Sequence, residues 1–112
     1  MNRLAKLFSL EGRAALVTGG NSGIGFALAR ALGMAGAKLV LVARRDAELA
    51  DAVKRLAGDG ITVRAVAADL AEPSGVDRAL KGVAGIDIDI LVNAAGINLR
   101  QPFAEEIGRA HV

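Results

Sequence analysis

The chain has 112 residues, of which 53% are hydrophobic and 14 are glycine, and its formal net charge is +2. This length allows one domain at most, and a small basic excess without a basic block argues against a nucleic-acid partner. The absence of cysteine excludes disulfides and thiolate metal sites, and no run reaches the roughly 18 apolar residues of a membrane span. We therefore expect a cytoplasmic protein that binds a small molecule.

Strand-like and helix-like segments alternate along the chain. Short apolar runs, as in parallel strands covered on both faces, occupy residues 13–18, 39–42, 61–66 and 88–93. Helical periodicity begins at Gly23, after Asp46 as an N-cap, and at Pro73. Glycines that would end these helices are Gly36, Gly58 and Gly85.

This alternation has no linker, repeat or low-complexity segment. Right-handed crossovers between such strands build a parallel sheet with helices on both faces. We expect an α/β fold of three layers with strand order 3-2-1-4. Four strands make about half of a doubly wound parallel sheet, so the chain is predicted to be the N-terminal half of one.

A glycine-rich turn, Thr-Gly-Gly-Asn-Ser-Gly-Ile-Gly at residues 18–25, joins the first strand to the first helix. Such a turn brings backbone N–H groups and the positive end of the helix dipole to one point, which favours a dinucleotide pyrophosphate. Gly19 is expected to permit the tight turn, and Gly23 to let the backbone approach the phosphates. Gly25 is expected to let helix and strand pack closely.

Two further segments stand at the ends of later strands, Asp69-Leu70 and Asn93-Ala94-Ala95-Gly96. Together with Thr-Gly-x-x-x-Gly-Ile-Gly, they make the chain similar to the N-terminal half of the short-chain dehydrogenases/reductases. The likeness extends over roughly residues 7–105. It implies a Rossmann-type fold and hydride transfer between a nicotinamide cofactor and a carbonyl or secondary alcohol.

The resemblance implies that the glycine turn binds the cofactor through Asn21, Ser22 and Ile24 as well as through its glycines. Donors of Asn21 and Ser22 would meet phosphate and ribose. Both residues are also common turn formers, and this plainer interpretation stays open.

The later motifs are implied to contact the adenosine and the second ribose. Asp69 would accept from the adenine amino group, with the Leu70 backbone beside it. Asn93 would tie the central strands together, and the backbone from Asn93 through Ala94 to Gly96 would line the ribose. The alternatives are that Asp69 simply ends a strand and that Asn93 is an ordinary turn residue.

The choice of cofactor depends on the residues after the second strand. An acidic side chain there would bond the ribose hydroxyls of NAD and repel a 2′-phosphate. Here Ala43 occupies that place and Arg44, whose planar guanidinium suits phosphate, follows it. The sequence therefore favours NADP, with NAD as the second possibility and a solvated basic turn as the structural alternative.

The catalytic residues of the family, a Tyr-x-x-x-Lys pair with Ser and Asn, follow the fourth strand. This chain contains no tyrosine, so we predict that it holds no catalytic residue and is inactive by itself. The lone His111 is expected to be incidental, and no metal site is predicted. The intact parent is expected to be an enzyme and a homo-oligomer.

Two interpretations of function follow. In the first, the parent is an NADP(H)-preferring oxidoreductase, and residues 96–102 resemble the substrate loop of gluconate 5-dehydrogenase-like and polyol reductases, which suggests a sugar acid or polyol. In the second, the chain is a non-catalytic dinucleotide-binding module. The apolar residues 90–92 at an open sheet edge argue against a finished module.

The division of the chain is expected at residue 105, with a partial NAD(P)-binding domain over 1–105 and a non-native tail over 106–112. Back-translated, Glu-Ile-Gly-Arg-Ala-His-Val can read gag atc gga aga gca cac gtc. These codons match the start of a common short-read sequencing adapter in frame, whose next codon is a stop. Sequencing the source locus tests this expectation, because native DNA that encodes these seven residues and a true stop would contradict it.

Overall fold

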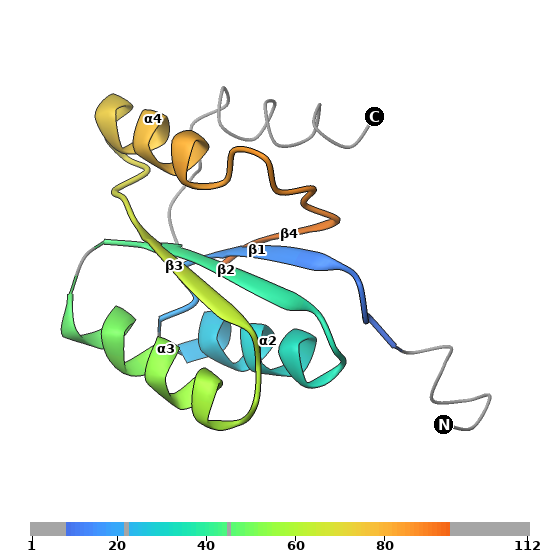
Figure 1. Ribbon diagram of the computed structural model, residues 1–112. Coiled ribbons are helices and arrows are strands. Elements are labelled where there is room, and N and C mark those ends of the chain that lie inside the picture. Colours follow the sequence, from blue (N-terminus) through green and yellow to red (C-terminus); the bar gives the residue numbers. More distant parts are fainter. Residues whose placement is uncertain (1–8, 22, 45, 95–112) are drawn as a thin grey trace.

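The computed structural model describes residues 9–94, except residues 22 and 45. Strands and helices alternate over this range, as the sequence predicts (Figure 1). In chain order they are β1 (Ala14–Thr18), α2 (Gly23–Met34), β2 (Lys38–Ala43), α3 (Ala47–Gly58), β3 (Val63–Ala67), α4 (Pro73–Gly82) and β4 (Ile90–Asn93).

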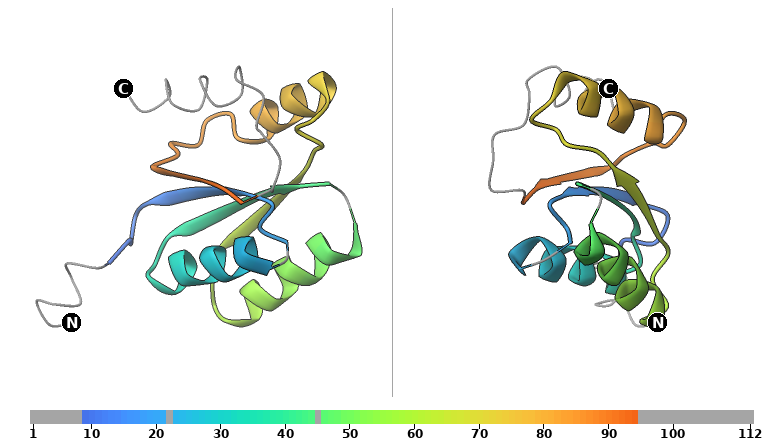
Figure 2. Two further views of the ribbon diagram at one scale, coloured as in Figure 1. Left: turned by 180° about the vertical axis from the view of Figure 1, so that it is seen from behind. Right: turned by 90° about the vertical axis from the view of Figure 1, so that its left-hand side faces the viewer.

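The four strands form one parallel sheet in the order β3-β2-β1-β4. Helices α2 and α3 cover one face and α4 covers the other, which gives three layers (Figures 1 and 2). The predicted fold class and strand order are therefore confirmed. Because all four strands run in the same direction, their carboxyl ends meet at one edge of the sheet.

Side chains of the central strands point alternately to the two faces of the sheet and pack into two separate apolar cores. Leu16 of β1 packs on the α4 side with Val76 and Ala79, whereas Val17 packs on the side of α2 and α3 with Leu56. Since both faces of β1 are covered, all five of its residues are buried. A continuous apolar run is the sequence pattern that such a strand requires.

Helix starts follow the predicted capping chemistry. The Asp46 carboxylate accepts a hydrogen bond of 2.8 Å from the Leu49 N–H at the start of α3, and Pro73 occupies the first turn of α4. Pro at this position loses no intrahelical bond, since the first N–H groups of a helix have no partner within it.

Helix ends agree less closely with the predicted glycines. Gly36 follows α2 with φ of +109°, but Gly58 is the last residue of α3, and the left-handed glycine there is Gly60 with φ of +81°. Helix α4 ends at Gly82, and the predicted Gly85 follows three residues later with φ of +83°. Glycine spacing alone did not distinguish a terminal helical residue from the residue that leaves the helix.

Two strands start later than the apolar pattern predicts. Ile61 and Ile88 are buried, with 7% and 1% exposure, yet they precede β3 and β4 and lie in connecting segments. An apolar residue indicates burial in the core. A residue belongs to a strand only where its backbone is hydrogen-bonded to an adjacent strand. The expected strands therefore included these buried connector residues.

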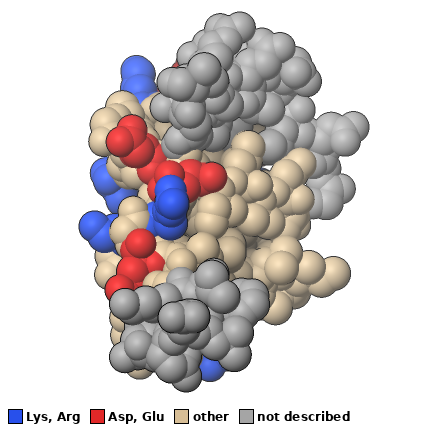
Figure 3. All heavy atoms as spheres, turned by 90° about the vertical axis from the view of Figure 1, so that its right-hand side faces the viewer, with Lys and Arg blue, Asp and Glu red and all other residues tan. Residues whose placement is uncertain are grey.

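Charged side chains are unevenly distributed over the face shown in Figure 3. Figure 3 shows the molecule from the right-hand side of Figure 1. In this view the Lys, Arg, Asp and Glu side chains gather on the left, and a broad area on the right carries none. Among the described residues the exposed large apolar side chains are Ile24, Leu28, Met34 and Leu91, from α2 and β4. No described helix combines the length and apolarity needed to cross a bilayer.

Candidate functional site: a cavity at the carboxyl edge of the sheet

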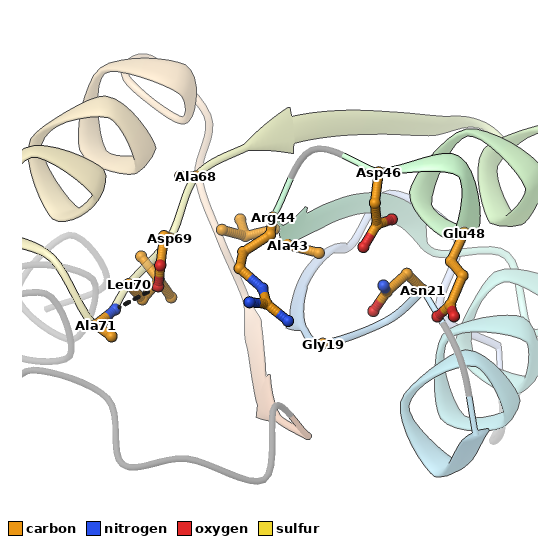
Figure 4. A pocket seen from close by; sticks show the side chains of 11 residues that line it. Gly19, Asn21, Ala43, Arg44, Asp46, Glu48, Ala68, Asp69, Leu70 and Ala71 are labelled. Carbon is orange, nitrogen blue, oxygen red and sulfur yellow. Dashed lines mark hydrogen bonds between the residues drawn. The ribbon is translucent and has the colours of Figure 1, made fainter.

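The carboxyl ends of β1, β2 and β3 are bound to one another through the backbone. The Gly19 N–H donates to the Val42 carbonyl at 3.0 Å, and the Ala68 N–H donates to the Ala43 carbonyl at 2.8 Å. Beside these bonds lies a cavity of about 490 Å³ (Figure 4). It is lined by Gly19, Asn21, Val42, Ala43, Arg44, Asp46, Glu48, Ala68, Asp69, Leu70 and Ala71.

The turn between β1 and α2 is built by glycine. Gly19 has φ of +70° and Gly23 has φ of +58°, a left-handed backbone that favours glycine. In the described part of the chain, the N–H groups of Gly20 and Asn21 donate to no protein acceptor. The turn therefore presents unpaired backbone donors, as a site for an anion requires.

Gly25 allows the start of α2 to lie close to the backbone of Gly19, in the loop that follows β1. A Cβ at this position would overlap the Gly19 carbonyl oxygen and lie 3.1 Å from the Ala94 Cβ. The predicted close packing therefore occurs against the end of β1 and the residue after β4. Gly20, which the sequence analysis did not single out, is restricted too, because a Cβ there would lie 2.7 Å from Leu41 Cδ2.

Arg44 lies at the end of β2 and extends into the cavity (Figure 4). It is exposed, and the three ion pairs among the described residues are Arg13–Asp89, Arg30–Asp59 and Arg55–Asp51. Its guanidinium thus has no carboxylate partner in this part of the chain. Ala43 precedes it, so no acid stands at the end of β2.

Asp69 and Leu70 form the opposite wall, after β3. One carboxylate oxygen of Asp69, Oδ1, accepts from the Ala71 N–H at 3.0 Å (Figure 4). Leu70 is 5% exposed and belongs to the core on the α4 side. This hydrogen bond orients the Asp69 side chain at the cavity, and no described residue donates to its second carboxylate oxygen.

Asn93 lies outside the cavity lining, at the end of β4. The Thr18 hydroxyl donates to Asn93 Oδ1 at 2.9 Å, and the Ala94 N–H donates to the Thr18 carbonyl at 3.0 Å. These two bonds join the carboxyl ends of β1 and β4. Contacts of Asn93 and Ala94 with a cofactor ribose stay predictions.

The structure therefore brings five predicted residues together around one cavity, namely Gly19, Asn21, Arg44, Asp69 and Leu70. Gly23, Ile24 and Gly25 lie beside it at the start of α2, and Ile24 is 77% exposed. Ser22 and Gly96 are outside the described residues, as are residues 96–102 and the predicted tail.

Sequence reasoning missed two acidic lining residues. Asp46 was expected only as a helix cap and Glu48 was not considered, yet both line the cavity from the start of α3. Their position directly after β2 was the available signal, because every segment that leaves the carboxyl edge of the sheet lies near the site. Across the described ranges, no group of three or more His, Cys, Asp or Glu residues forms a candidate metal site.

Comparison with known proteins agrees with this geometry. A family model described as short chain dehydrogenase matches residues 13–109. L-xylulose reductase from Bos taurus is 41% identical over 102 residues, covering 91% of this chain and 39% of that protein. Gluconate 5-dehydrogenase from Gluconobacter oxydans is 39% identical over 104 residues, covering 88% of this chain and 40% of that protein.

A solved structure shows the same arrangement of elements. L-sorbose reductase from Gluconobacter frateurii, in complex with NADPH and L-sorbose, aligns with a TM-score of 0.78 and 33% identity. The alignment covers 92% of this chain and 47% of that one. The chain thus spans about two fifths of the length of the curated relatives and about half of the structural one.

Proposed function

Because the chain belongs to the short-chain dehydrogenase family, we propose that it is the cofactor-binding half of an NADP(H)-preferring oxidoreductase. The proposed reaction moves a hydride between nicotinamide and a carbonyl or secondary alcohol. The observation that carries the cofactor preference is Arg44, which extends into the cavity without a carboxylate partner in the described part of the chain.

The residues present fit a dinucleotide. The N–H groups of Gly20 and Asn21 donate to no acceptor among the described residues, and the first turn of α2 contains no acidic residue that would oppose a phosphate. Asp69 keeps one carboxylate oxygen for an adenine amino group. When bound, the cofactor supplies the hydride chemistry, while these residues supply binding and orientation.

Arg44 and Ala43 would together select the phosphorylated ribose. A guanidinium forms charge-assisted hydrogen bonds with phosphate oxygens, and alanine offers no carboxylate to repel them. Three structural neighbours bear on this proposal, since their structures contain NADPH or NADP. The cofactor of this chain is inferred from its own residues and from that likeness.

Arg44→Ala tests the proposal in the 112-residue chain. Loss of a charge-assisted phosphate contact should weaken NADPH binding by about 1–3 kcal/mol, which is roughly 5- to 150-fold in Kd. NADH binding should change less than about twofold, since it lacks the 2′-phosphate. Both constants can be measured by titration calorimetry or by the fluorescence of the reduced nicotinamide.

Arg78→Ala is the matched control, because Arg78 is an exposed arginine of α4 that does not line the cavity. It removes the same charge and should leave both constants unchanged. Equal weakening of NADPH and NADH by Arg44→Ala would show instead that Arg44 only stabilises the turn, and the proposed preference would then be wrong.

For the parent enzyme we propose a sugar acid or polyol and its keto form as the substrate pair. The support comes from relatives named as L-xylulose reductase, gluconate 5-dehydrogenase and 5-keto-D-gluconate 5-reductase. The parent, once its complete reading frame is recovered, should oxidise polyols with NADP faster than it oxidises aliphatic alcohols. Activity on aliphatic alcohols alone would contradict this substrate class.

A non-catalytic dinucleotide-binding module is the second candidate, since the described residues form a cofactor cavity and the catalytic residues of the family would follow β4. The source reading frame separates the two proposals. A frame that continues past residue 105 to a Tyr-x-x-x-Lys sequence supports the oxidoreductase. A native stop codon directly after Val112 supports the module.

A further inference from the structure

Two helices begin beside the cavity, and their first turns differ in charge. The first turn of α2 contains no acidic residue, whereas α3 begins with Asp46 as N-cap and Glu48 in its first turn. The N-terminus of a helix carries a partial positive charge that stabilises anions. This charge is available at α2 and is opposed by two carboxylates at α3.

The carboxylates of α3 lie on the same cavity as Arg44. Figure 4 shows Asp46 and Glu48 on the side next to Asn21, while Arg44 extends from the end of β2. Arg44 is paired with neither acid, as the ion pairs of the described residues show. Among the described residues, this corner of the cavity therefore combines one cation that has no carboxylate partner with two carboxylates.

The Asp46 and Glu48 carboxylates differ in their hydrogen-bond partners. Asp46 Oδ1 accepts the Leu49 N–H at 2.8 Å, so this carboxylate is engaged in the helix cap. Glu48 is exposed and has no hydrogen bond or ion pair within the described ranges. No described side chain therefore pairs with the Glu48 carboxylate, and its removal leaves the cap intact.

We propose that Glu48 is a specificity-determining residue that opposes the 2′-phosphate attracted by Arg44. This inference rests on the proposed cofactor site. A 2′-phosphate would be attracted by the guanidinium and repelled by the carboxylate, whereas the ribose hydroxyls of NAD would find an acceptor in Glu48. The chain accordingly prefers NADP less strongly than Arg44 alone would dictate, and it accepts NAD as well.

The test compares NADPH and NADH binding to the unsubstituted 112-residue chain and to Glu48→Gln. Glutamine keeps the size of the side chain and removes its charge. Exposed charges of this kind interact weakly, so the NADPH:NADH affinity ratio should rise by about two- to fivefold at low salt. In roughly 1 M salt, where screening acts over about 3 Å, the rise should largely disappear.

Asp77→Asn is the matched control, because it removes one negative charge from an exposed residue of α4 away from the cavity. It should leave the ratio unchanged within the error of the titration. Glu48→Ala provides a second variant, with its melting curve measured alongside. The same rise in both Glu48 variants would attribute the effect to charge rather than to an altered fold.

The outcomes separate this inference from the function on which it rests. Binding of both cofactors with the same ratio in the unsubstituted and Glu48-substituted chains overturns the inference alone. Failure of the unsubstituted chain to bind either cofactor overturns the proposed site together with the inference. A ratio that rises equally in Asp77→Asn also overturns the inference, because a general charge effect would then explain it.

Discussion

Strands β1 and β4 lie side by side in the sheet, and both have apolar sequences, yet their burial differs. Residues Leu16 of β1 and Leu91 of β4 are register partners, but Leu16 is 0% exposed and Leu91 is 38% exposed. Strand β1 has β2 and β4 as neighbours, whereas β4 stands at the end of the strand order. Burial here is decided by neighbouring elements rather than by the apolar character of the strand.

The two faces of β4 also differ in burial. Ile90 and Val92 are partly buried against the core on the side of α2 and α3, while Leu91 faces the side of α4 and is exposed. An apolar strand edge of this kind can pair with another chain. The comparison predicts that equivalent substitutions in β1 and β4 have unequal effects.

The largest expected effect is that of Leu16→Ala. Removal of a fully buried leucine leaves a cavity and should lower the free energy of unfolding by about 2–5 kcal/mol. Leu91→Ala in the register partner should cost about 1 kcal/mol or less, since that side chain is already partly in water. Urea unfolding of both variants measures the difference, and equal losses would show that β4 is as well covered as β1.

Gly25→Ala tests the point at which the ends of β1 and β4 meet. The added Cβ would overlap the Gly19 carbonyl oxygen and crowd Ala94, so the glycine turn must shift. We expect a loss of about 1–3 kcal/mol in unfolding free energy and a loss of NADPH binding. Both can be followed by denaturation and cofactor titration.

Gly58→Ala is the control for this prediction. Gly58 ends α3, a Cβ there would meet nothing within 4 Å, and its φ is not positive. Alanine should therefore maintain or raise stability by up to about 1 kcal/mol and leave cofactor binding intact. Similar destabilisation by both substitutions would mean that Gly25 has no special packing role.

The smallest expected effect concerns the side-chain bond between the two strands. Thr18→Val keeps the shape of a buried side chain but removes the hydroxyl that donates to Asn93 Oδ1 at 2.9 Å. The expected loss is about 1 kcal/mol, because Asn93 is exposed and its oxygen can bond water instead. Thermal unfolding measures the loss, and Thr18→Ser, which retains the hydroxyl, should fall closer to the unsubstituted chain.

Much of the fold was predictable because local chemistry and the global topology agree. The apolar run over β1, the Asp46 cap and Pro73 each specify an element that the structure contains. Parallel pairing and the strand order then follow from the handedness of the crossovers. The predictions that failed concern the ends of elements. Gly58 is the last residue of α3 rather than the residue after it, and Ile61 is a buried residue of a connecting segment rather than of a strand.

The candidate site was predictable in part, through residues that follow directly after strands. Gly19, Arg44 and Asp69 meet because the carboxyl ends of parallel strands share one edge of the sheet. The sequence alone did not show that Glu48 lies on the same cavity, since it belongs to a helical pattern in which an exposed acid is common. Glu48 lines the cavity at the strand ends because α3 packs on the sheet. A local sequence pattern does not contain this packing.

The sequence by itself determined the alternation of strands and helices, the glycine turn and the basic residue after β2. These features depend on backbone conformation and on apolar periodicity, which act over a few residues. The tertiary structure decided which apolar strand is buried, which glycines must lack a Cβ and which acids line the same cavity as Arg44. Those properties depend on contacts between segments far apart in the chain, and no local pattern contains them.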